Sequence, residues 1–131
     1  MKLVLDTNAY CLCDIGHDAA LEAASQATTL LLPVIAYGEL HYGFQHGAKL
    51  VRNLQRLDRF IEEFQVRIIL VDLDVARNFG AIFARLRKKG RPIPTNDIWI
   101  SACCMTVGGT LLTADHHFLD VDQINVTLLH E

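Results

Sequence analysis

The chain has 131 residues, of which 51% are hydrophobic and 21% charged, and its formal net charge is −3. This composition is typical of a compact protein with one core and excludes an intrinsically disordered chain. No apolar segment approaches the roughly 20 residues that a membrane-spanning helix needs, and no basic region precedes an apolar one at the start. We therefore expect a single domain over residues 1–131, located in the cytoplasm and not associated with a membrane.

The predicted elements alternate between short apolar strands and longer amphipathic helices. Strands are predicted at residues 2–5, 29–33, 66–71, 110–113 and 126–129. Helices are predicted at residues 18–27, 34–46, 48–64, 74–89 and 96–107. Asp18 and Asp74 are the expected N-caps of two of these helices, and Gly90 is expected to end the fourth. This alternation predicts an α/β protein whose central parallel sheet is covered by helices on both faces.

The cysteines occur as two close pairs, Cys11 with Cys13 and Cys103 with Cys104. Neither pair has the spacing of a disulfide framework or of a zinc site. We therefore predict four free thiols.

The basic residues are concentrated in one part of the sequence, because eleven of the twelve Lys and Arg residues lie between Lys49 and Arg91. The densest run, RLRKKGR, contains Arg85, Arg87, Lys88, Lys89 and Arg91. One interpretation is a surface that contacts RNA or another polyanion. The other is a solvated helix end, where cations complement the helix dipole.

Two aspartates follow predicted strands, Asp6 after LVL and Asp115 after TLLT. Ligands of parallel α/β sheets bind beyond the carboxyl ends of the strands, where the strand order reverses. If these two strands are neighbours, both carboxylates project from the same edge of the sheet. Each aspartate taken alone also fits an ordinary turn.

Two further acids lie where simple surface charges are not expected. Glu39 is on or beside the apolar stripe of its helix, and Asp97 is in the first turn of an apolar helix. The alternative for Glu39 is a charged side chain that reaches solvent at the edge of the stripe. The alternative for Asp97 is a charge that complements the helix dipole. Four carboxylates at one site would raise each other's pKa, and a hard divalent cation such as Mg²⁺ or Mn²⁺ would relieve that repulsion. Such a site activates water for attack on a phosphodiester.

These acids and their flanking residues resemble the PIN domain, in particular the VapC-type ribonucleases that are the toxins of bacterial toxin–antitoxin pairs. The resemblance covers essentially the whole chain. It is carried by LDTN with Asp6, IAYGEL with Glu39, IPTNDIWIS with Asp97 and LLTADHHF with Asp115.

The resemblance implies a three-layer α/β/α sandwich with a central parallel sheet, and an endoribonuclease that depends on Mg²⁺ or Mn²⁺. It places Asp6, Glu39, Asp97 and Asp115 at the catalytic, metal-binding positions, with Asn8 and Thr113 as supporting polar residues. The implied partners are an RNA substrate, a VapB-type antitoxin and an identical subunit in a homodimer. For the fourth acid, Asp120 is a weaker alternative to Asp115.

Other functions remain open at this point. A housekeeping RNA-processing nuclease of the PIN type would have the same site. A receiver-like signalling module requires a second acid beside Asp6 and a lysine after a later strand, and no basic residue follows Arg91. We interpret His116 and His117 as exposed loop histidines, with contact to the substrate or to the site as the alternative.

Overall fold

The computed structural model describes residues 1–130. Within that range, five strands form one parallel sheet in the order β3-β2-β1-β4-β5. The strands are β1 Lys2–Leu5, β2 Thr29–Pro33, β3 Arg67–Ile69, β4 Thr110–Thr113 and β5 Asn125–Leu128. The first strand lies in the middle, so the strand order reverses between β1 and β4. The predicted parallel sheet is confirmed, and the two strands that precede Asp6 and Asp115 are neighbours in it.

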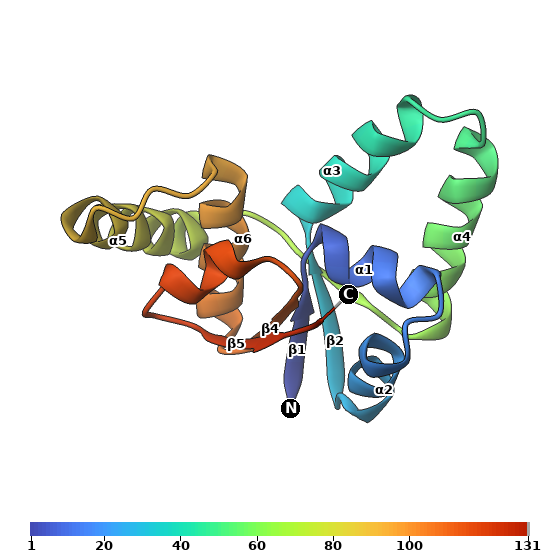
Figure 1. Cartoon of the computed structure of the whole chain (residues 1–131), viewed down its shortest axis with the longest axis horizontal. Coiled ribbons are helices and arrows are strands. Elements are labelled where there is room, and N and C mark those ends of the chain that lie inside the picture. The colour runs from blue at the N-terminus through green and yellow to red at the C-terminus, as the bar shows by residue number, and fades with distance from the viewer. Residues whose placement is uncertain (131) are drawn as a thin grey trace.

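Helices connect the strands and cover the sheet. They are α1 Thr7–Asp14, α2 Asp18–Gln26, α3 Val34–Gln45, α4 Leu50–Glu63, α5 Leu73–Lys89, α6 Thr95–Val107 and the short 3₁₀ helix η1 His116–Asp120. Figure 1 shows α5 and α6 on one side of the strands, with α3 and α4 on the other. Among the described helices, none combines the length and the apolar character needed to cross a membrane.

The structure corrects several predicted boundaries. Helix α1 was not predicted, and it begins directly after Asp6, which is its N-cap. The cap of α5 is Asp72 and not Asp74, because Asp72 has extended backbone and its side chain accepts the amide proton of Val75 at 2.9 Å. The cap of α2 is His17, so Asp18 is the first helical residue. Both predictions chose an acid one or two positions too late.

Much of the interior comes from β1, β4 and α6. Leu3, Val4 and Leu5 are buried, as are Leu111 and Leu112 on the neighbouring strand. Burying side chains of this size contributes about 1.5–3 kcal/mol each. Helix α6 packs against these strands with a run of buried residues from Ile100 to Cys104. All four cysteines are free thiols, as predicted.

The start of β4 packs closely against β1. A Cβ at Gly109 would lie 2.9 Å from Cγ2 of Val4 and 3.2 Å from the carbonyl oxygen of Lys2. Only a glycine fits there without displacing β1. Gly109 therefore allows the start of β4 to lie close to β1, the strand that ends at Asp6.

Candidate active site

The four predicted acids line a single cavity of about 220 Å³, together with Thr7, Asn8 and Ile100. Asp6 directly follows β1, and its backbone amide donates to the carbonyl of Leu112 on β4, at 3.4 Å. Asp115 follows the end of β4 by two residues. Glu39 comes from the middle of α3 and Asp97 from the first turn of α6. Four elements distant in sequence therefore converge at the carboxyl edge of the sheet, at the point where the strand order reverses.

Asp6 is the most deeply buried of the four acids, with 3% of its surface exposed. Its Oδ1 accepts a hydrogen bond from the amide of Ala9 at 2.8 Å, which is the N-cap contact of α1. Its Oδ2 accepts the hydroxyl proton of Thr113 at 2.5 Å. These two contacts fix the orientation of the carboxylate, because both of its oxygens are held.

Glu39 is held by two side chains from neighbouring helices. Its Oε1 accepts a hydrogen bond from the hydroxyl of Thr7 at 2.7 Å, and its Oε2 accepts one from the side-chain Nδ2 of Asn96 at 3.4 Å. Thr7 and Asn96 were not predicted to belong to the site. Their signal in the sequence is adjacency, because each directly borders one of the predicted acids, Asp6 or Asp97.

His117 contacts two of the acids. Its Nδ1 lies 3.1 Å from Oδ1 of Asp115 and 3.4 Å from Oδ2 of Asp97. Its backbone amide also donates to Oδ1 of Asp115 at 2.9 Å, since Asp115 caps η1. The histidine is exposed, as predicted, but it belongs to η1 and not to a loop, and its ring is directed at the site.

Two of the four acids, Asp6 and Asp97, have raised pKa values. Burial raises the pKa of Asp6 from its ordinary value of 3.8 to about 6, even though hydrogen bonds from Thr113 and Ala9 act in the opposite direction. The charges of Asp97 and Asp115 raise the pKa of Asp6 further. Burial also raises the pKa of Asp97, with additional contributions from Asp115 and Glu39. Four carboxylate side chains around one small cavity form a donor set that suits a hard divalent cation.

Of the other predicted site residues, Asn8 and Thr113 belong to the site and Asp120 does not. Asn8 is exposed and lines the cavity, and Thr113 lies beneath it as a buried partner of Asp6. Asp120 does not line the cavity, and its Oδ1 lies 4.0 Å from Nε of Arg91. The structure thus places Asp115, and not Asp120, beside the other three acids.

The basic run is partly neutralised. Arg85 and Lys89 both form ion pairs with Asp122, at 2.9 Å each, and Lys89 also donates to the carbonyl of Asp120 at 2.7 Å. Within residues 1–130, Arg87 and Lys88 form no ion pair. The contacts of Arg85 and Lys89 connect the end of α5 to the segment after η1. Because Arg87 and Lys88 have no acidic partner, they are the members of the run most available to an external anion.

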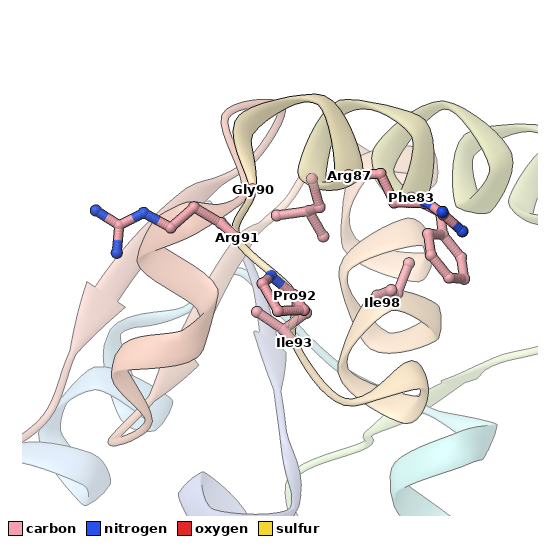
Figure 2. Close-up of a pocket in the computed structure, with 8 residues that line it drawn as sticks. Phe83, Arg87, Gly90, Arg91, Pro92, Ile93 and Ile98 are labelled. Carbon is pink, nitrogen blue, oxygen red and sulfur yellow. The ribbon is translucent and has the colours of Figure 1, made fainter.

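A second cavity, of about 300 Å³, lies between the end of α5, the segment after it and α6. Its lining is mostly apolar and includes Phe83, Ile93 and Ile98. Figure 2 shows the guanidinium of Arg91 extending away from these apolar side chains. None of the four acids lines this second cavity, so the second cavity is distinct from the candidate active site.

Comparison with known proteins identifies one family. Residues 3–124 match the model of the PIN domain. Ribonuclease VapC5 of Mycobacterium tuberculosis is 30% identical over 121 residues, which cover 91% of this chain and 87% of that protein. The crystal structure of VapBC2 from Rickettsia felis, bound to a promoter DNA fragment, matches with a TM-score of 0.87 at 24% identity, covering 99% of this chain and 100% of that one. VapBC-5 from Mycobacterium tuberculosis matches with a TM-score of 0.75 at 25% identity and 98% coverage of both chains.

Proposed function

Since this chain belongs to the PIN-domain family, we propose that it is a metal-dependent endoribonuclease, the VapC-type toxin of a toxin–antitoxin pair. The observation that carries the proposal is the convergence of Asp6, Glu39, Asp97 and Asp115 on one cavity. The raised pKa values of Asp6 and Asp97 support it, because burial and neighbouring carboxylates that shift a pKa in this way are typical of functional sites. A ribonuclease relative at 30% identity over most of both chains supports the same activity.

The four acids would hold Mg²⁺ or Mn²⁺ at the sheet edge. When bound, the cation supplies charge neutralisation at the phosphate and lowers the pKa of a water molecule. The water would give up a proton as its oxygen attacks phosphorus, the bond from phosphorus to the 3′ oxygen would break, and that oxygen would take up a proton. The products are a 3′-hydroxyl end and a 5′-phosphate end.

The other polar residues of the site act on the carboxylates. Thr113 fixes Asp6 and also accepts a hydrogen bond from the backbone amide of Asp115 at 2.9 Å. Thr7 and Asn96 hold Glu39 toward the cavity. Such partners orient metal ligands, and their loss typically costs 10–100-fold in metal affinity or activity.

The proposed partners are those of toxin–antitoxin pairs. The structures that resemble this chain include VapBC complexes from Rickettsia felis and Mycobacterium tuberculosis. We therefore include a VapB-type antitoxin, an identical subunit in a homodimer and an RNA substrate in the proposal, with the cytoplasm as the place of action. For the RNA, Arg87 and Lys88 are the strongest members of the basic run, because Arg85, Lys89 and Arg91 have acidic neighbours.

A cleavage assay tests the proposed activity. Antitoxin-free protein is incubated with cellular RNA in Mg²⁺, in Mn²⁺ and in EDTA, beside the variants Asp97→Asn and Asp120→Asn. We expect cleavage that requires the metal, falls by at least about 100-fold in Asp97→Asn and persists in Asp120→Asn. Equal cleavage by Asp97→Asn and the parent protein would overturn the site. Growth arrest on expression, relieved by the antitoxin, distinguishes a toxin from a housekeeping nuclease.

A further inference from the structure

The exposed ring of His117 is directed between two acids of the site. Its Nδ1 lies 3.1 Å from Oδ1 of Asp115 and 3.4 Å from Oδ2 of Asp97. Asp97, Asp115 and His117 each offer one possible ligand atom, and these three atoms lie within 4.8 Å of one another. The proposed four-carboxylate centre contains only oxygen ligands, so this nitrogen is an addition to it.

We propose that His117 is a direct ligand of the metal, together with Asp97 and Asp115, and that its nitrogen gives the site a preference for Mn²⁺ over Mg²⁺. This inference rests on the proposed function, since it concerns the cation of that same site. It extends that function by naming a fifth ligand and the ion that the ligand selects.

The spacing of the donor atoms supports coordination. Two ligands at right angles on an octahedral ion, each about 2.1 Å from it, lie about 3.0 Å apart. The distances of 3.1 and 3.4 Å from Nδ1 to the two carboxylate oxygens are close to this value.

Local structure holds the histidine in place. Asp115 is the N-cap of η1 and accepts the backbone amide proton of His117 at 2.9 Å. The same aspartate therefore fixes both the backbone of His117 and the carboxylate that its ring approaches. The neighbouring His116 is also exposed, but no contact between its ring and a carboxylate occurs in the part of the chain that the structure describes.

The chemistry of the donor predicts the ion. Imidazole nitrogen is a ligand of first-row transition metals, whereas Mg²⁺ is bound almost entirely by oxygen. A site of carboxylates alone accepts both Mg²⁺ and Mn²⁺. The same site with one imidazole should discriminate between them, because only Mn²⁺ gains substantially from the nitrogen.

Pulsed electron paramagnetic resonance of the Mn²⁺-loaded protein detects the nitrogen directly. The spectra are recorded at one fixed pH for the parent protein, for His117→Ala and for the matched control His116→Ala. We expect ¹⁴N coupling to Mn²⁺ in the parent and in His116→Ala, and its loss in His117→Ala. Calorimetry should show Mn²⁺ affinity reduced by about 10-fold in His117→Ala, with Mg²⁺ affinity changed by less than about 3-fold. Circular dichroism establishes that each variant is folded.

The outcomes separate this inference from the function on which it rests. Mn²⁺ that binds the parent without ¹⁴N coupling, or coupling that survives in His117→Ala, would overturn the role of His117 and leave the carboxylate site intact. A parent protein that binds neither cation would overturn both proposals.

Discussion

The hydroxyl of Thr113 donates to Oδ2 of Asp6 at 2.5 Å, and this contact joins the carboxyl ends of β4 and β1. Both residues are buried. The same hydroxyl oxygen accepts the backbone amide proton of Asp115 at 2.9 Å. One threonine thus sets the relative positions of two of the proposed metal ligands.

Replacing this threonine should affect both stability and metal binding. Thr113→Val keeps the shape but leaves one oxygen of Asp6 and the amide of Asp115 without their partner. A buried polar group that loses its hydrogen bond costs about 1–3 kcal/mol. Urea denaturation in EDTA should show that loss, and calorimetry should show Mg²⁺ affinity reduced by about 10-fold. The exposed Thr127 on β5 provides the control, and Thr127→Val should leave both values unchanged.

Asp6 should make the metal-free protein less stable as the pH rises. Its pKa in the folded protein is about 6, above the ordinary value of 3.8, so the fold favours the protonated carboxyl. The corresponding stabilisation is complete below about pH 4 and is lost as the pH rises through about 6. Its total is roughly 3 kcal/mol, since each pKa unit corresponds to about 1.4 kcal/mol.

The comparison of the parent protein with Asp6→Asn isolates this contribution. Free energies of unfolding are measured in EDTA between pH 4 and pH 7. The stability of the parent relative to Asp6→Asn should decrease across this range, because the amide does not titrate. A difference that stays constant or increases would contradict the raised pKa of Asp6.

Metal should stabilise the protein more at neutral than at acidic pH. A cation binds the ionised carboxylates, so protons and metal compete for Asp6 and Asp97, whose pKa values are both raised. The rise in melting temperature on addition of Mg²⁺ or Mn²⁺ should be larger at pH 7.5 than at pH 5. Asp97→Asn should lose most of this rise at both pH values, and an undiminished rise would exclude Asp97 as a ligand.

The sequence was sufficient for the sheet and for the convergence of the acids, for physical reasons that particular residues illustrate. A strand of a parallel sheet that is covered on both faces requires a continuous apolar run, as at Leu3 to Leu5 and Leu111 to Leu112. The acids after these runs mark the ends of the strands. Helix α1 was missed because its first residues, Thr7 and Asn8, are also typical turn residues. The contact of His117 with Asp97 was only the alternative to an exposed loop position, because the sequence does not show which way an exposed ring is directed.

The packing of β4 against β1 depends on Gly109. Gly109→Ala would place a Cβ 2.9 Å from Cγ2 of Val4 and 3.2 Å from the carbonyl oxygen of Lys2, so both the Val4 side chain and the backbone at Lys2 must move. We expect a loss of about 1–3 kcal/mol in urea denaturation, together with weaker metal binding at the sheet edge. At Gly108 an added Cβ meets no atom within 4 Å, and only the positive φ of 66° opposes the change, so Gly108→Ala should cost about 1 kcal/mol. Similar losses of stability, with metal binding intact in both variants, would contradict a specific role for Gly109.

The final prediction concerns the basic run. Arg85 and Lys89 are paired with Asp122, whereas Arg87 and Lys88 are exposed and have no ion pair within residues 1–130. If RNA phosphates contact this end of α5, the unpaired cations should contribute most of the binding energy. Replacing both by alanine should then weaken RNA binding and reduce its dependence on salt concentration.

The measurement uses fluorescence anisotropy with single-stranded RNA at several salt concentrations, in the Asp97→Asn background to prevent cleavage. Each lost phosphate contact should lower the slope of log affinity against log salt by about 0.7, or about 1.4 for the pair. A matched control removes two exposed cations, Arg52 and Arg59 of α4, which lies on the opposite side of the strands from α5 in Figure 1. Equal slopes for the two double variants would show that the run is a solvated helix end, with its cations complementing the dipole and pairing with Asp122.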